Sequence, residues 1–135
     1  MAKIDELEIG QSASYERTVS EEDVVRFAEV SGDDNPVHLD EEFPSKTLFK
    51  GRIAHGMLGA EFISTAVGTK LPGYSSIYIS QSLRFRAPVR IGDTVVTTAM
   101  VKSIDKERKR VTMETVCAIG DKIVIDGEAE QMLTA

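Results

Sequence analysis

Hydrophobic and polar residues alternate along most of the chain after residue 75, which is the pattern of half-buried strands. We expect strands within 76–89, 94–104, 110–119 and 123–133. The connections RIGD, DKERK and GDK are short, as in antiparallel hairpins, and 8–19 is a further candidate strand. In the last strand we expect one face to consist of Ile123, Ile125, Ala129 and Leu133, and the other of Asp126, Glu128 and Glu130.

Two earlier segments have helical patterns. Residues 20–32 predict a short helix, in which Ser20 and Asp23 resemble a capping box and Gly32 is a plausible stop. Residues 55–73 are apolar nearly all round a helix, so we expect this helix to be buried on most sides. The connection 33–54 is rich in turn residues and long for so small a domain, and such loops are often functional.

These elements predict a single α+β domain over residues 1–135, with one central helix wrapped by an antiparallel sheet. An exposed sheet edge needs covering. Edge-to-edge pairing with a second copy would cover it, so we expect a homodimer or a higher homo-oligomer.

The composition excludes several classes of protein. The net charge is −6, Trp is absent, and no basic stripe is interleaved with aromatic residues, so we expect no nucleic-acid partner. The single cysteine cannot form an internal disulfide, and we expect a buried, inert thiol. The sequence has neither a signal peptide nor an apolar run of about 18–20 residues, so we expect a cytoplasmic protein without a membrane partner.

The stretch SGDDNPVHLD, residues 31–40, carries the first candidate chemistry. His38 lies five positions after Asp33, a spacing that brings the two together neither on a helix nor on a regular strand. Asn35-Pro36 supplies the bend that would let them converge. A carboxylate beside an imidazole suits acid–base catalysis. Alternatively the stretch merely ends a helix and turns, and the pattern alone does not separate Asp33 from Asp34. A calcium loop fits poorly, because the expected Gly and Glu positions are not filled.

The second histidine precedes the buried helix, in the motif AHGML. The first turn of a helix offers unpaired N–H groups, and Gly56 would let a ligand atom approach them closely. This is a natural oxyanion site for a carbonyl oxygen that gains charge. The other interpretation is that Gly56 allows tight helix–sheet packing while His55 caps the helix. For His55 we expect a structural role.

Three motifs together resemble a known family: SGDDNPVHLD, GRIAHGML and SIYISQSLRFRAPVRIGDTV. They are similar to the MaoC-like, (R)-specific enoyl-CoA hydratases, which have a hotdog fold, and the resemblance covers nearly the whole chain. The resemblance implies catalytic roles for Asp33 and His38, and a loop shaped by Asn35 and Pro36. It also implies that Gly56, Asn35 and Ser64 bind the substrate. The Gly56 N–H would bind the thioester oxygen, and Ser64 would lie near the acyl pocket.

The expected reaction is reversible syn addition of water to a trans-2-enoyl-CoA, giving an (R)-3-hydroxyacyl-CoA. It requires no cofactor, and we see no metal-ligand spacing in the sequence. The alternatives are a hotdog acyl-CoA thioesterase and a non-catalytic acyl-thioester-binding subunit. Acyl chain length, the carrier (CoA or acyl carrier protein) and the pathway, whether polyester synthesis or fatty-acid metabolism, stay open. Candidate cations for the CoA phosphates are Lys50, Arg52, Arg84, Arg86 and Arg90, each of which alone is more simply a surface charge.

Overall fold

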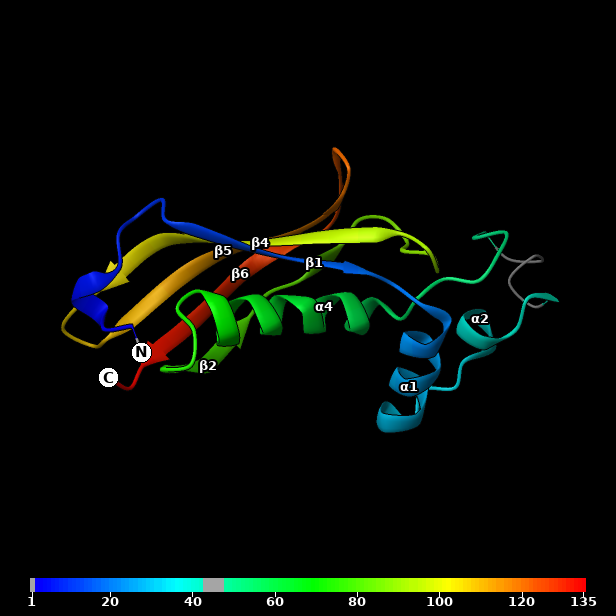
Figure 1. Ribbon diagram of the computed structural model, residues 1–135, viewed down its shortest axis with the longest axis horizontal. Helices are drawn as coiled ribbons and strands as arrows, with labels where there is room; N and C mark the ends of the chain where they lie inside the picture. The colour runs from blue at the N-terminus through cyan, green and yellow to red at the C-terminus, as the bar shows by residue number, and fades with distance from the viewer. Residues whose placement is uncertain (1, 43–47) are drawn as a thin grey trace.

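In the computed structural model, a curved antiparallel sheet lies along one side of a central helix (Figure 1). The structure describes residues 2–42 and 48–135. The helical elements are η1 (Ile4–Glu6), α1 (Glu21–Ser31), α2 (Pro36–Leu39), α4 (Gly56–Thr65) and the π-helical η2 (Ala66–Lys70). The strands are β1 (Ser12–Thr18), β2 (Ser76–Gln81), β3 (Arg84–Phe85), β4 (Thr94–Asp105), β5 (Arg110–Ile119) and β6 (Lys122–Leu133).

The strand order is β1-β4-β5-β6-β2, and β3 pairs with β6 beyond the end of β2. Every one of these pairings is antiparallel. The predicted α+β class and the sheet around one helix are therefore confirmed. Figure 1 shows α1 and α2 beyond the N-terminal end of α4, whereas both chain termini lie near its other end.

The predicted strand 76–89 is divided into β2 and β3. The cause is a close crossing of two backbones: a Cβ at Gly127 in β6 would lie 1.8 Å from the carbonyl oxygen of Ser82. Ser82 also donates its N–H to the Glu128 carbonyl and accepts the Glu128 N–H on its hydroxyl. Only glycine permits this approach, which interrupts the ladder between the two short strands.

The predicted core face of the last strand was wrong at its first residue. Ile123 is 44% exposed, while the neighbouring Val124 and Ile125 are both buried. The register of β5 and β6 shifts here, since Cys117 pairs with Ile125 and Ala118 with Ile123, which leaves Val124 as an extra residue. Such a bulge turns the side chains on one side of it to the opposite face.

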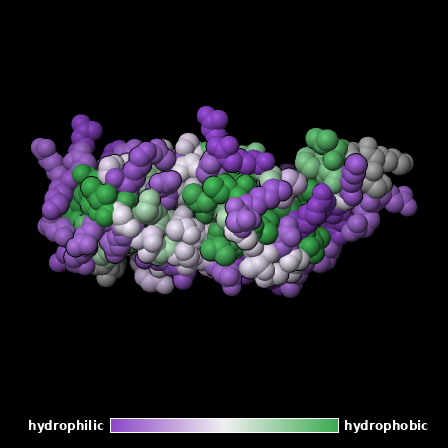
Figure 2. All heavy atoms as spheres, turned by 90° about the horizontal axis from the view of Figure 1, so that it is seen from above, coloured by the Kyte–Doolittle hydropathy of each residue, from purple (hydrophilic) through white to green (hydrophobic). Residues whose placement is uncertain are grey.

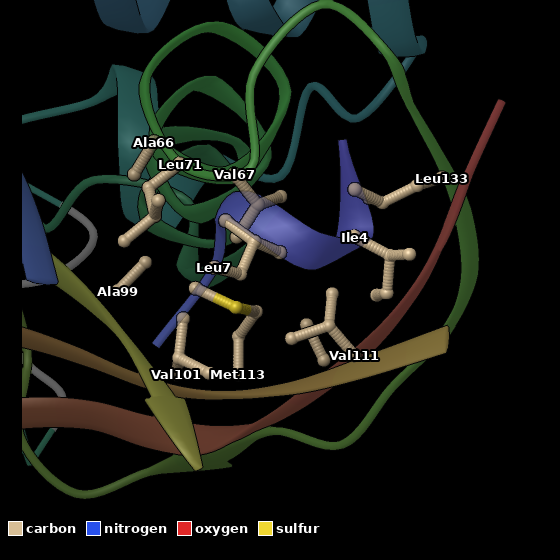
Figure 3. Close-up of a cluster of buried hydrophobic side chains, with 11 residues drawn as sticks. Ile4, Leu7, Ala66, Val67, Leu71, Ala99, Val101, Val111, Met113 and Leu133 are labelled. Carbon is tan, nitrogen blue, oxygen red and sulfur yellow. The ribbon is translucent and has the colours of Figure 1, made fainter. Parts of the chain in front are cut away.

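One face of α4 packs on the sheet, through Leu58, Gly59, Phe62 and Ile63. In the single chain only that face of the helix is buried, because Met57 is 56% exposed and Glu61 is exposed too. Burial on most sides, as the sequence predicted, is therefore not found in the single chain. The predicted helix continues as η2, whose Ala66 and Val67 join an apolar cluster with Met113 and other side chains of η1 and the sheet (Figure 3). Cys117 is buried in a second apolar cluster, which includes Leu58 and Phe62 of α4, and the predicted burial of this thiol is confirmed.

Local sequence signals set the boundaries of α1. The Ser20 hydroxyl accepts a hydrogen bond from the Asp23 N–H, and the Asp23 carboxylate accepts one from the Ser20 N–H, so the predicted capping box is confirmed. Gly32 ends the helix with φ of 79°. The predicted loop 33–54 contains the short helix α2; its residues 43–47 lie outside the described part.

Seen from above, hydrophilic side chains are spread over the surface with smaller apolar areas between them (Figure 2). No helix in the described residues is long and apolar enough to cross a membrane.

Candidate active site

The segment after Gly32 bends through two side-chain-to-backbone hydrogen bonds. The Asn35 N–H donates to Asp33 Oδ1 at 3.3 Å, and the Val37 N–H donates to Asn35 Oδ1 at 3.1 Å. Asn35 is thus the N-cap of α2, and Pro36 is its first residue, where the missing N–H costs nothing. The bend that Asn35-Pro36 predicts is present, and it directs Asp33 and His38 to one place. Asn35 itself is used to shape the loop.

Asp33, His38 and His55 converge at the N-terminal end of α4. One carboxylate oxygen and one nitrogen from each ring all lie within 4.8 Å of one another. His38 and His55 are buried, at 8% and 3% exposure, whereas Asp33 is exposed. The two rings are stacked, with centroids 3.8 Å apart and planes 27° apart.

A second segment, residues 52–55, is hydrogen-bonded to Val37 and His38 of the first segment. His38 Nδ1 donates to the Ile53 carbonyl at 2.8 Å, and the Ile53 N–H donates to the Val37 carbonyl at 3.2 Å. Arg52 Nε donates to the His38 carbonyl at 2.7 Å. The guanidinium of Arg52 is also paired with Glu21 of α1, at 2.7 Å. The main chain of His38 is therefore held from both α1 and the 52–55 segment.

These contacts define the protonation state of His38. The Ile53 carbonyl only accepts hydrogen bonds, so Nδ1 carries the proton and a neutral ring leaves its lone pair on Nε2. Burial lowers the pKa of His38 below its ordinary value, and the neighbouring His55 adds to that; the bond to Ile53 and the Asp33 carboxylate oppose it. His38 is neutral at pH 7 and has one nitrogen free to take a proton.

Gly56 begins α4 beside a mostly apolar pocket. Its N–H belongs to the first turn, whose amides have no partner within the helix. The pocket has a volume of about 410 Å³ and is bordered by His55, Gly56 and side chains that include Leu58, Phe62, Phe85 and Val89. A Cβ at residue 56 would lie 2.9 Å from the Phe85 ring, so a side chain at this position would meet the wall of the pocket. Both interpretations of Gly56, close packing and ligand approach, are compatible with this position.

The other sequence-based candidates fall in different places. Ser64 is half-buried in α4 and is not among the described residues that border the pocket. Arg86 is paired with Asp126 at 2.6 Å, and Arg90 donates to the carbonyls of Phe49 and Arg52. Of the five candidate cations for the CoA phosphates, Lys50, Arg84 and Arg90 form no ion pair with any described residue.

The sequence pattern predicted a structural role for His55, as a cap of the helix that follows it. Within the described chain its ring makes no capping bond to α4; instead Nε2 lies 2.9 Å from the carbonyl oxygen of Asp33. The only available signal was its place beside Gly56, because its partner is 22 positions away in the sequence.

Comparisons with known proteins agree with this architecture. Residues 5–122 match the family model of the MaoC like domain. An (R)-specific enoyl-CoA hydratase of Rhodospirillum rubrum is 51% identical over 97% of this chain and 91% of its own length. A 3-hydroxybutyryl-CoA dehydratase of Methylorubrum extorquens is 48% identical over 93% of this chain and 80% of its own.

Among solved structures, an R-hydratase of Pseudomonas aeruginosa in its unliganded form superposes with a TM-score of 0.91 at 46% identity, over 97% of this chain and 84% of that one. An (R)-hydratase from A. caviae involved in PHA biosynthesis gives 0.90 at 38% identity, over 94% and 97%. The hotdog fold that the sequence motifs predict is thereby confirmed. This chain belongs to the MaoC-like family of (R)-specific enoyl-CoA hydratases.

Proposed function

We propose that the protein is an (R)-specific enoyl-CoA hydratase that adds water reversibly, in syn geometry, to a trans-2-enoyl-CoA. The single observation that carries the proposal is the Asp33–His38 pair, held within 4.8 Å beside the first turn of α4. The relatives of known activity are hydratases and dehydratases, which catalyse the same equilibrium in opposite directions.

In this reaction a water molecule binds between Asp33 and His38. The pair removes a proton from the water as its oxygen attacks C3 of the substrate, and a proton is delivered to C2 from the same side. Neutral His38, with Nε2 unprotonated, is suited to accept a proton. Because the two groups are coupled, we assign the proton transfers to the pair and not to single residues.

The thioester oxygen gains negative charge as C3 is attacked, and the Gly56 N–H is the proposed donor to it. The partial positive charge at the helix N-terminus acts in the same direction. The apolar pocket next to Gly56 receives the acyl chain; its volume of about 410 Å³ lies in the range of small-molecule sites. We keep Asn35 as the residue that shapes the catalytic loop, and Ser64 as a candidate for contact with the acyl chain in the assembled protein.

We also propose that the chain forms a homodimer through β2, which lies at one end of the strand order. Ile77, Tyr78 and Ile79 in this strand are 45%, 38% and 40% exposed. A long apolar edge strand invites pairing with a second copy. Sedimentation of the purified chain would test this. The cytoplasmic location stays a sequence-based prediction, for cell fractionation to check.

The function is tested by following the absorbance of the enoyl-thioester band with crotonyl-CoA and longer trans-2-enoyl-CoAs, while a thiol reagent reports free CoA. A hydratase removes the band without releasing thiol. Thiol release would identify the thioesterase alternative instead. If a folded preparation changes no substrate, CoA-linked or carried by acyl carrier protein, but binds them, the non-catalytic alternative is correct.

A further inference from the structure

A second histidine lies against the proposed catalytic pair, and the proposed reaction leaves its role unexplained. The side chain of His55 is 3% exposed, and Nε2 lies 2.9 Å from the Asp33 carbonyl oxygen. Because a carbonyl only accepts hydrogen bonds, Nε2 carries a proton. The other nitrogen, Nδ1, is buried and has no hydrogen-bond partner in the described part of the chain. A proton there would be a buried donor without an acceptor, so the ring fits the tautomer with hydrogen on Nε2 alone.

This hydrogen bond acts on the backbone of Asp33, whose side chain is exposed and has few other restraints. The Asp33 N–H donates to Ser31 Oγ at 3.1 Å, and the carboxylate accepts the Asn35 N–H at 3.3 Å. Among the hydrogen bonds between described residues, that from His55 is the one that connects Asp33 to the 52–55 segment and to the start of α4. Without it, Asp33 would be anchored only through its own loop.

The same ring also restrains the other two parts of the site. One face stacks on His38 at 3.8 Å, and Phe27 of α1 packs on the ring at 4.9 Å. Gly56, the proposed oxyanion donor, is the next residue in the chain. One buried side chain therefore contacts the backbone of Asp33 and the ring of His38, and directly precedes the first residue of α4.

We propose that His55 is a positioning residue for the reaction: as the Nε2-protonated tautomer, it fixes the Asp33 loop through the Asp33 carbonyl and the His38 ring through stacking. This inference rests on the proposed function, because the rate it affects is the rate of hydration. According to this proposal, position 55 requires a side chain that donates a hydrogen bond from the place of Nε2, and filling the space is less important.

Three substitutions separate the hydrogen bond from packing. In His55→Gln, the amide nitrogen occupies the place of Nε2 and still reaches the Asp33 carbonyl. His55→Asn has the same amide group, but its nitrogen lies near the place of Nδ1 and cannot reach. His55→Phe keeps an aromatic ring on His38 and removes both the donor and the unpaired nitrogen. Thr97→Val, which removes a buried contact of 3.3 Å to Cys117 on the neighbouring strand of the sheet, is the control for loss of stability alone.

We expect activity and stability to rank these variants differently. The kcat of His55→Gln should stay within roughly tenfold of wild type, whereas His55→Asn and His55→Phe should lose roughly 100-fold, as for a displacement of about 1 Å at a catalytic group. KM should change by less than about threefold in all three, since the apolar side chains that line the rest of the pocket are unchanged. His55→Phe should be at least as resistant to heat as His55→Gln, because its side chain adds no buried polar atom. Thr97→Val should unfold more easily and keep its kcat.

The proposal is overturned if kcat of the three variants follows their thermal stability, or if His55→Gln is no more active than His55→Asn; the ring is then only packing. A wild-type protein that hydrates no enoyl thioester would contradict the proposed function instead. In that case the position of Asp33 still decides the inference: its carbonyl ¹³C shift should be kept in His55→Gln and moved in His55→Asn, and equal shifts in both would refute it.

Discussion

At its C-terminal end, α4 continues into η2 and packs on a purely apolar cluster with side chains such as Leu71, Met113 and Leu133 (Figure 3). At its N-terminal end it meets two stacked, buried histidines and a pocket of about 410 Å³. The first end stabilises the fold by removing apolar surface from water. The second buries polar groups, most of which are paired by hydrogen bonds of the 52–55 segment, while Nδ1 of His55 has no partner among the described residues. Stability and chemistry are thus separated along one helix.

The largest effect on activity should come from the proposed catalytic pair. Asp33→Asn and His38→Ala should each lower kcat on the order of 10³-fold, since each group serves in both proton transfers. Thermal unfolding should change little for Asp33→Asn, because that side chain is exposed. The measurement is loss of the enoyl band in protein matched for folded fraction. A variant that keeps a tenth of the wild-type rate would contradict the assignment of its residue.

The opposite end should show the reverse pattern. Met113 is 0% exposed, and Met113→Ala should lower the free energy of unfolding by about 2–5 kcal/mol. Activity per folded molecule should remain, because the cavity opens far from the histidines. Chemical denaturation gives the first quantity and the enoyl assay below the transition gives the second. A large loss of kcat in the folded variant would show that the two ends are coupled.

Two glycines in the same continuous helix compare the ends with one substitution. Gly56→Ala should reduce kcat by about 10²-fold, because the added methyl group would lie 2.9 Å from Phe85 and crowd the proposed oxyanion position. Gly68→Ala in η2 meets no atom within 4 Å and should be neutral or stabilise by about 0.5–1 kcal/mol, through helix propensity. Equal activities of the two variants would argue against a substrate contact at Gly56.

A smaller effect concerns pH. Burial lowers the pKa of His38, so the acid limb of kcat/KM should have its midpoint below about pH 6.5, the ordinary histidine value. In the unfolded chain this histidine binds a proton near that value, and in the folded protein it does so only at lower pH. Its contribution therefore favours folding above about pH 6.5 and is lost as the pH falls through the folded pKa. His38→Gln should remove this part of the pH dependence of Tm; an unchanged slope would be inconsistent with a buried, neutral His38.

The sequence predicted what local chemistry decides. The capping box of Ser20 and Asp23 and the bend at Asn35-Pro36 involve neighbours in the chain, so their side chains specify them directly. Features that depend on contacts between segments far apart in the sequence were not predicted. The break between β2 and β3 follows from the backbone crossing at Gly127, and the exposure of Ile123 follows from the register of β5.

The candidate site divides in the same way. The pairing of a carboxylate with the imidazole of His38 could be proposed from the bend at Asn35-Pro36, and the family motif selected Asp33. The role of His55 could not, because its partner is the backbone of a residue far away in sequence, and a carbonyl carries no side-chain signal. Arg52 was a candidate for phosphate binding, yet its guanidinium is used internally by Glu21 and the His38 carbonyl.

The central claim is that two groups on one side of the substrate add the elements of water together. The most direct test is hydration of crotonyl-CoA in D₂O, with the configuration at C2 and C3 of the product read by NMR. The account predicts a single syn adduct with the (R) configuration at C3, whose formation is lost in Asp33→Asn. An anti adduct, a mixture of configurations at C2, or an (S)-3-hydroxyacyl product would contradict it.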